Sequence, residues 1–295
     1  MTLAIAAVLI FGVQDALTKV TVQSISPFQL SMMRFWSFAA FSLFLVARQA
    51  PLSQAFRSRY PLLQVVRAVL LVVDIWCFAA SLITVPLAEV QAIVLVYPLL
   101  ATVMAIPILG EKVGPFRFVM VAIGFFGALV IVRPGGLPFS WGVVYALGSA
   151  ACYAAYLALT RKVSSHDSTA TSMVYVGVVG LVLTSAVGVF FWQPLGGIEL
   201  LIVAGVMVLS IASHGLMMMA LSRAPASVLQ PFNYLGLPWG IALSYVIFGH
   251  LIEPGALAGG AIIVVAGLIV MAREQILARA GRHHPPEAAE ESPQH

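Results

Sequence analysis

Charged residues are scarce in this chain: Asp, Glu, Lys and Arg together make up 9% of its 295 residues, whereas 61% are apolar. So few charges cannot cover the surface of a water-soluble protein of this length, which excludes the soluble globular classes. The two cysteines, Cys77 and Cys152, exclude a disulfide framework and a metal site built from cysteines. Both fall in apolar runs, where we expect them to be small core side chains.

What is present is a succession of apolar runs of about 20 residues, the length at which a helix crosses a bilayer. The runs lack the alternation of barrel strands, and a backbone in lipid must satisfy its own hydrogen bonds, so helices are predicted. The expected fold class is therefore all-α integral membrane, with ten transmembrane helices. Their predicted ranges are 2–22, 28–47, 61–83, 86–108, 115–133, 139–161, 170–192, 197–221, 226–249 and 254–273.

Basic residues are distributed unevenly between the connections. With the N-terminus in the cytoplasm, eleven Lys and Arg residues lie in cytoplasmic connections or the tail, and two, Lys19 and Arg133, lie on the other side. This bias predicts a multi-pass protein of the bacterial inner membrane with both termini in the cytoplasm. The net charge of +4 thus reflects topology, and no nucleic-acid partner is expected. The polar segment 274–295 is predicted to be a disordered cytoplasmic tail.

The two halves of the chain are similar to each other. A shift of 139 residues aligns VPLAEVQAIVL with APASVLQPFNY, and it matches Pro86 with Pro225 and Gln91 with Gln230. An odd number of spans in each half turns the second half over in the membrane, so the halves are predicted to be inverted five-helix repeats. Such repeats are typical of transporters that open to either side in turn. The predicted units are residues 1–134 and 138–273.

Three stretches carry a family resemblance: SPFQLSMMRFW, VRAVLL and ASLITVPLAEVQAIVLVYPLLATVMAIPILGEK, with a weaker second copy of the last one. They resemble the EamA-type ten-helix branch of the drug/metabolite transporter superfamily, over the chain as far as about Arg273. The resemblance implies a structural role for Glu111 in the GEK exit, but the second copy has His250 there, and no arginine stands opposite Arg34. Equal roles for the halves are therefore not expected. The opening FGVQDALTK is similar to the branch that takes up riboflavin or S-adenosylmethionine.

Charged and polar side chains in the first span are candidates for a cavity, because a charge at a helix centre costs about 2.5–3.5 kcal/mol on insertion scales. Gln14, Asp15 and Lys19 lie close together, and the spacing of four places Asp15 and Lys19 on one face, where they can pair. Asp15 is a candidate contact for substrate or proton, with Lys19 stabilising its charge. The alternative is a structural ion pair near the outer interface.

Charged residues also occur in the second, third and eighth spans. Arg67 and Asp74 share a helix face but lie about 10 Å apart along the axis, so they do not pair with each other. Asp74 is expected to line a cavity and carry a proton, or else to pair with Arg34. Arg34 and Arg67 are placed nearer the cytoplasmic ends, where anchoring or interhelical pairing is expected. His214 is either a proton relay or a packed core residue.

Prolines mark the fourth and ninth spans. Pro86 suits the first turn of a helix, where its missing N–H is harmless. Pro98 and Pro238 fall inside predicted spans, where a proline frees a carbonyl and kinks the helix. These kinks are expected either to line a cavity and allow hinging or to assist packing. Gln91 and Gln230 are expected to line the two entrances of a common cavity.

Aromatic and amide side chains near these prolines can stack on a planar organic solute or bond to it. Core packing or an interfacial belt is the alternative for each of them. The candidates are Tyr97, Tyr153, Tyr156, Asn233, Tyr234 and Trp239.

The predicted function is secondary active transport of a small organic metabolite by alternating access, driven by protons or by exchange. Amino acids, cofactors and drug-like compounds all stay open as substrates. The sequence contains no P-loop, no G-x-S-x-G and no H-E-x-x-H, so we expect neither ATP drive nor an enzyme, and no cofactor. An intramembrane enzyme, a lipid flippase and a non-transporting sensor are the alternatives. The expected partners are the substrate and membrane lipid, and a homodimer is an alternative to a monomer.

Overall fold

The computed structural model is built of helices and contains no strand in the residues that it describes, which are 1–48, 51–110, 114–132, 140–221, 223 and 226–281. One short 3-10 helix, η1, follows α9. The elements are α1 (Thr2–Thr21), α2 (Pro27–Ala47), α3 (Leu52–Ala55), α4 (Pro61–Thr84), α5 (Leu87–Val94), α6 (Tyr97–Leu109), α7 (Pro115–Val132), α8 (Trp141–Val163), α9 (Thr169–Gly188), η1 (Val189–Phe191), α10 (Gly197–Leu221), α11 (Ala226–Asn233), α12 (Gly236–Phe248) and α13 (Pro254–Gly281).

Nine segments in the described part of the chain are long and apolar enough to cross a membrane, and α5 and α6 together form one of them. The remaining predicted span, 226–249, which is the ninth along the chain, consists of α11 followed by α12. The expectation of an all-α integral membrane protein is therefore confirmed. α13 continues to Gly281, beyond the predicted end of the last span at Arg273. The helix thus includes the first residues of the predicted tail, and 282–295 lie outside the described residues.

The fourth and ninth predicted spans are each interrupted near the middle. α5 ends at Val94 and α6 begins at Tyr97, so Pro98 lies in the first turn of α6 and not in a helix interior. Pro238 likewise lies in the first turn of α12, just after the break that follows α11. A proline has no N–H for the carbonyl four residues earlier, which explains why a new helix begins at each position. The prediction of one kinked helix is thus corrected to two short helices.

Pro86 is the N-cap of α5 and not a residue of its first turn, because its backbone is extended, with φ −63° and ψ 154°. Serine caps begin two of the long helices. The hydroxyl of Ser26 accepts from the N–H of Phe28 at the start of α2, and the hydroxyl of Ser168 accepts from Thr171 at the start of α9. Such caps satisfy N–H groups that have no partner inside the helix.

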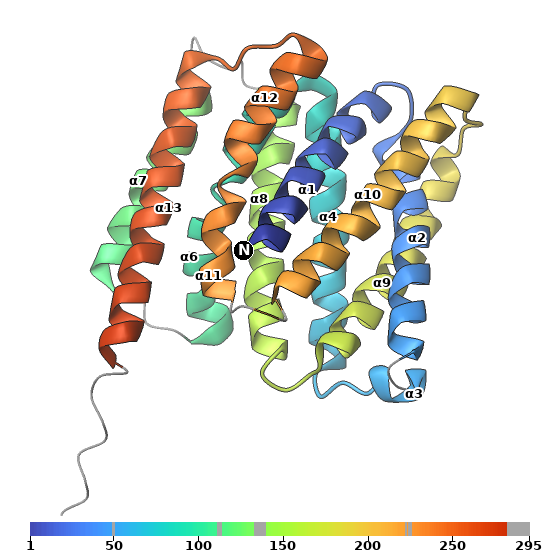
Figure 1. Cartoon of the computed structure of the whole chain (residues 1–295), viewed down its shortest axis with the longest axis horizontal. Coiled ribbons are helices and arrows are strands. Elements are labelled where there is room, and N and C mark those ends of the chain that lie inside the picture. The colour runs from blue at the N-terminus through green and yellow to red at the C-terminus, as the bar shows by residue number, and fades with distance from the viewer. Residues whose placement is uncertain (49–50, 111–113, 133–139, 222, 224–225, 282–295) are drawn as a thin grey trace, which may run out of the picture.

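Figure 1 shows α13 and α7 side by side along one edge of the bundle, and α2 and α9 near the opposite edge. Between these edges α1 packs against α10, and α4 packs against α8. α7 and α13 approach closely at Gly127 and Gly259, where an added Cβ on either glycine would collide with the carbonyl oxygen of the other. Small residues therefore set the distance between these two helices.

The bundle has two ends, which we name by the connections that they hold. At the α1–α2 end, α1, α4, η1 and α12 end, and α2 and α13 begin. At the α2–α4 end, α2 and α8 end, and α4 and α9 begin. Gln29 joins α2 to the segment after η1 at the α1–α2 end, because its amide donates to the Gln193 carbonyl at 2.7 Å and accepts from the Gln193 N–H at 3.1 Å.

Asp167 joins the α8–α9 connection to the segment before α4 at the α2–α4 end. Its carboxylate accepts hydrogen bonds from the Ser58 hydroxyl, from the Arg59 N–H at 2.9 Å and from the Gln64 amide at 2.9 Å. Burial raises the pKa of Asp167, but these hydrogen bonds and the charge of His166 outweigh it, so the pKa lies below its usual value. The ionised form of Asp167 therefore stabilises this contact.

We expect this stabilisation to be present above the pKa of an unfolded aspartate, about 3.9, and to be lost as the pH falls through the lower folded pKa. Asp167→Asn should lower the melting temperature in detergent by about 2–4 °C at neutral pH. The difference from wild type should be smaller at about pH 3 than at neutral pH, because the stabilisation is lost as the pH falls toward and through the folded pKa. Glu199→Gln is the control, since Glu199 accepts from the N–H of Gly196 at the start of its own helix. An equal loss of melting temperature at neutral pH and at about pH 3 would show that the charge of Asp167 does not cause the stabilisation.

Candidate functional site

Three charged side chains from three helices face one another inside the bundle, and we name them the charged cluster. Asp15 comes from α1, Arg34 from α2 and Asp74 from α4. Arg34 interacts electrostatically with both carboxylates, and the two carboxylates repel each other. All three side chains keep partial solvent accessibility within the bundle, which is the environment expected for charges in membrane-spanning helices.

Each member of the charged cluster has one polar partner from another helix. The Gln91 amide of α5 donates to Asp15 Oδ2 at 3.2 Å, and the Ser149 hydroxyl of α8 donates to Asp74 Oδ1 at 2.6 Å. Arg34 Nε donates to the Ser210 hydroxyl of α10 at 3.0 Å. Since none of these partners is charged, the guanidinium and the carboxylates keep donors and acceptors for a ligand.

Two expectations about this region need correction. Lys19 does not pair with Asp15: its ammonium donates to the carbonyls of Leu82 and Val85, at 3.0 and 2.9 Å, where α4 ends. A helix end leaves carbonyls without partners, and they attract the ammonium. Arg34 was expected near the cytoplasmic end of its span, but it lies nearer the α1–α2 end. α2 begins there at Pro27, and Arg34 follows about two helical turns later. This depth brings Arg34 to the carboxylates.

A group of tyrosines lies beside the charged cluster, and we name Tyr97, Tyr153 and Tyr156 the tyrosine cluster. Tyr97 and Tyr153 meet edge to face at 4.9 Å between ring centroids, and Tyr153 and Tyr156 stack at 5.8 Å with an interplanar angle of 20°. The Asn233 amide donates to the Tyr97 hydroxyl at 3.2 Å. Tyr153 also interacts electrostatically with Asp74, so the two clusters adjoin. Planar rings of this kind stack on planar solutes.

Arg67 closes the tyrosine cluster toward the α2–α4 end. Its guanidinium lies over the Tyr156 ring at 5.3 Å, donates to the Thr160 hydroxyl at 3.1 Å and donates to the Ser172 carbonyl at 2.8 Å. The side chain is 1% exposed. These contacts agree with the expected interhelical role of Arg67, because they join α4 to α8 and α9.

Two other candidates, His214 and Trp239, have contacts that favour packing. His214 Nδ1 lies 2.8 Å from the Ser210 carbonyl, and its ring packs edge to face on Phe11 and Phe38. Trp239 Nε1 donates to the Leu9 carbonyl at 2.9 Å, and the indole lies against Gly12 of α1. Gln14 and Tyr234 are also buried, and each has a buried polar atom without a described hydrogen-bond partner, Gln14 Oε1 and Tyr234 Oη.

Gln91 packs against Gly240 of α12, where an added Cβ would collide with the amide. This close approach places the amide within reach of Asp15. Glu111, Pro225 and the side chain of Gln230 lie outside the described residues, so their predicted roles stay predictions.

A cavity of about 10 Å³ borders Arg34 of the charged cluster. It runs along Pro27, Ser31, Arg34 and Phe78, with walls from α1, α2 and α4. This volume holds about one water molecule, so a metabolite does not fit without movement of the helices. Among the described residues, no three His, Cys, Asp or Glu side chains gather as a metal site would require.

Sequence reasoning missed Ser149 and Ser210, the partners of Asp74 and Arg34. A serine in an apolar span is common and gives no signal by itself, because its partner on another helix is visible only in the fold. It also gave no reason to pair Glu89 with His250, although His250 Nε2 lies 2.7 Å from Glu89 Oε1. The repeat gave a hint here, since His250 replaces the acidic residue expected at that position.

Comparison with known proteins identifies the family of this chain. A profile of the EamA-like transporter family matches residues 1–133 and again residues 140–273. A riboflavin transporter of Vibrio cholerae is 32% identical over 65% of this chain, and the chain spans 64% of the length of that protein. A riboflavin transporter of Rhizobium johnstonii is 29% identical, over 75% of this chain and 73% of its own length. An S-adenosylmethionine uptake transporter of Rickettsia prowazekii is 22% identical, over 90% and 89%.

One solved crystal structure superposes with a TM-score of 0.61 over 95% of this chain and 97% of its own, at 21% identity, which shows a shared fold. A helical membrane bundle that encloses charged and aromatic side chains is the construction of a solute transporter. The chain belongs to the EamA-like transporter family, within the drug/metabolite transporter superfamily. It is a multi-pass membrane protein, and the family and the relatives that it matches are transporters and not enzymes, as the sequence predicts.

We expect Arg34→Gln to destabilise the protein by about 3 kcal/mol, because it leaves Asp15 and Asp74 without a cation in the bundle. The double variant Arg34→Gln/Asp74→Asn should recover about 1 kcal/mol relative to the sum of the single changes. Melting curves in detergent measure the loss of stability of each single variant and of the double variant. Asp167→Asn is the control partner, since it lies in another contact and should combine additively with Arg34→Gln. Additive effects of Arg34 and Asp74 would show that the two charges do not act on each other.

Proposed function

We propose that this transporter takes up a metabolite with a planar heteroaromatic ring and a polar chain, and that it does so by alternating access. The observation that carries the proposal is that the tyrosine cluster lies beside the charged cluster, close enough for Tyr153 to interact electrostatically with Asp74. The tyrosine rings offer stacking surfaces, and Asp15, Arg34 and Asp74 offer donors and acceptors beside them. One end of the ligand would be flat and apolar, and the other would form hydrogen bonds.

Riboflavin has this construction, since it joins a planar tricyclic ring to a polyhydroxylated chain. Two relatives named as riboflavin transporters support the assignment, at 32% and 29% identity. The second candidate is S-adenosylmethionine, which carries a purine and a positively charged sulfonium. Two carboxylates against one guanidinium favour a cation, and a relative named for its uptake is 22% identical.

Alternating access rests on the proposed inverted repeats. The family profile matches each half, and Gly110 and Gly249, which coincide at a shift of 139 residues, both end helices with positive φ, of 71° and 64°. The contacts between the halves follow the same symmetry. α1 of the first half packs on α10 of the second, and their counterparts in the other half, α8 and α4, pack on each other. Two halves of similar structure and opposite direction can exchange conformations and open either end.

The partners of the charged cluster come largely from the second half. Asp15, Arg34 and Asp74 belong to residues 1–134, whereas Ser149 and Ser210 belong to residues 138–273. A movement between the halves would break these hydrogen bonds and expose the charges to water and solute. We propose that Asp74 carries the coupling proton in this step, with exchange of solute as the alternative drive.

Orientation follows the predicted charge bias: the α1–α2 end would face outward from a bacterial inner membrane, with both termini in the cytoplasm. Eleven basic residues against two support it. Lipid would surround the exposed apolar side chains, and a homodimer stays an alternative to a monomer.

We expect purified protein in liposomes to exchange radiolabelled riboflavin for internal riboflavin in a counterflow assay. Tyr153→Leu should weaken apparent affinity about threefold to tenfold, because it removes a stacking surface. Tyr245→Leu is the matched control, since Tyr245 is 56% exposed on the outside of α12 and should leave exchange unchanged. Exchange of S-adenosylmethionine in place of riboflavin would select the second candidate.

The same liposomes test the role of Asp74 when a pH gradient is imposed. Asp74→Asn should remove the acceleration by the gradient, because an amide does not bind a proton in this range. Glu199→Gln should keep it. An unchanged response in Asp74→Asn would rule out Asp74 as the proton carrier, and an absence of exchange with both ligands would contradict the proposed substrate class.

A further inference from the structure

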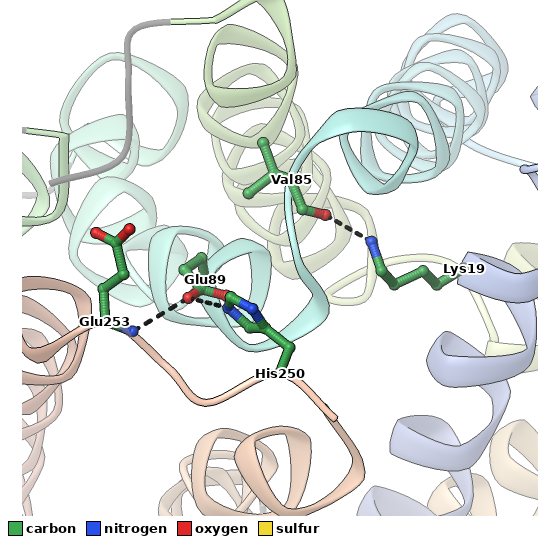
Figure 2. A network of polar contacts seen from close by, with 5 residues as sticks. All are labelled: Lys19, Val85, Glu89, His250 and Glu253. Atoms are coloured by element: carbon green, nitrogen blue, oxygen red, sulfur yellow. Dashed lines mark hydrogen bonds and ion pairs between the residues drawn. The ribbon is translucent and has the colours of Figure 1, made fainter. Parts of the chain in front are cut away.

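Glu89 and His250 form a contact between the two halves at the α1–α2 end. Glu89 lies in the first turn of α5, its side chain is 0% exposed, and Oε1 lies 2.7 Å from His250 Nε2. The same oxygen accepts from the Glu253 N–H at 3.3 Å, just before α13. Figure 2 shows both dashed contacts converging on Glu89 from the segment between α12 and α13, with the Glu253 carboxylate pointing away. We name this contact the outer latch.

The outer latch joins a buried group to an accessible one. Glu89 Oε2 is buried and has no described hydrogen-bond partner, so part of this carboxylate is uncompensated. The His250 side chain is 34% exposed and can therefore exchange protons with water. Its position is fixed by the backbone, because the His250 N–H donates to the Ser244 carbonyl at 3.2 Å after the positive-φ residue Gly249.

Lys19 holds the first-half side of the latch in place. Its ammonium bridges the Leu82 and Val85 carbonyls, and Val85 directly precedes Pro86 and α5. Figure 2 shows the Lys19 contact with Val85 on the segment that leads to Glu89. Lys19 also interacts electrostatically with Glu89 and lies over the Phe248 ring of α12 at 5.7 Å. The latch thus engages α1, the α4–α5 connection and the α12–α13 connection.

We propose that the outer latch is the gate at the α1–α2 end, and that protons from that side hold it closed by charging His250. The proposal rests on the proposed alternating access, and it assigns one of the two gates to named residues. A separation of the halves at this end would have to break the contact between His250 and Glu89 and leave a carboxylate with fewer partners.

The direction of the pH effect follows from the charges. A histidine changes charge between about pH 5 and 8, and a hydrogen bond between an imidazolium and a carboxylate is stronger than one from a neutral ring. A charged His250 therefore strengthens the closed contact, and acid favours closure. Among the described residues, the other charged groups at this contact are Lys19 of α1 and Glu253, whereas α4 contributes main-chain carbonyls.

The native cysteines report opening without a substrate. Cys77 on α4 and Cys152 on α8 are partly accessible and interact electrostatically with Asp74, so they lie beside the charged cluster. We would treat spheroplasts that express the chain with a membrane-impermeant methanethiosulfonate, purify the protein and measure the labelled fraction by mass. Cys77→Ser/Cys152→Ser gives the background. Because thiol reactivity itself depends on pH, the quantity compared is the ratio of variant to wild-type rate at each pH.

His250→Gln keeps a hydrogen-bond donor but cannot take up a proton. We expect it to label about fivefold faster than wild type at about pH 5.5 and at the wild-type rate at about pH 8.5. Glu89→Gln, which removes the carboxylate charge, should likewise label faster than wild type in acid. Glu199→Gln is the matched control for loss of a carboxylate, because Glu199 lies at the same end of the bundle but accepts from the Gly196 N–H at the start of its own helix. Its ratio should stay close to one at both pH values.

A His250→Gln ratio that is the same at both pH values would overturn the proposal, and so would an absence of labelling above background in every variant. Melting temperatures of both variants show whether they are folded, and either variant alone can decide the question. The labelling result does not depend on the substrate. A labelling ratio that changes with pH, in protein that does not exchange riboflavin, would support the gate and contradict the proposed substrate. Riboflavin exchange with a labelling ratio that is constant with pH would support the substrate and contradict the gate.

Discussion

Two carboxylates and one guanidinium inside a membrane-spanning bundle are the constraint on which the rest of the structure depends. Asp15, Arg34 and Asp74 cannot face lipid, so α1, α2 and α4 must turn these faces toward one another. Their neutral partners, among them Ser149 and Ser210, bring in α8 and α10 from the other half of the chain. Solvation of the charges is therefore tied to how the halves fit together. In the proposed mechanism, a conformational change between the halves is therefore coupled to the binding of solute or proton.

The contacts at the two ends of the bundle are built in the same way. At each end a carboxylate of one half accepts from groups of the other: Glu89 from His250 and Glu253, and Asp167 from Ser58 and Gln64. The two sites differ in exposure, since Glu89 is fully buried whereas Asp167 lies in a connection between helices. We infer that opening either end requires the loss of its contact while the other stays intact. The charged cluster between them is then reached from one side at a time.

The sequence predicts the fold far better than the site. Apolar length predicts the spans, and α4, Pro61–Thr84, begins and ends within a residue of its predicted range. The breaks between α5 and α6 and between α11 and α12 were expected only as kinks, because a proline shows that a hydrogen bond is lost and not whether the helix resumes at once. The depth of Arg34 in the membrane could have been predicted, since the second span begins only seven residues earlier, at Pro27. The partners of Lys19 and Asp74 could not have been predicted, because contacts between helices depend on the rotation of each helix about its axis, which one sequence does not specify.

The central claim is that the two ends open in turn, and distances between spin labels test it most directly. With Cys77 and Cys152 replaced by serine, one pair of labels at Ser24 and Leu251 reports the α1–α2 end, and another pair at Arg57 and Ser164 reports the α2–α4 end; all four positions are exposed. Pulsed electron resonance in lipid nanodiscs, with and without riboflavin, gives both distance distributions. The account predicts opposite changes, with one distance lengthening as the other shortens. Distances that lengthen together, or that both stay fixed in protein that performs exchange, would contradict it.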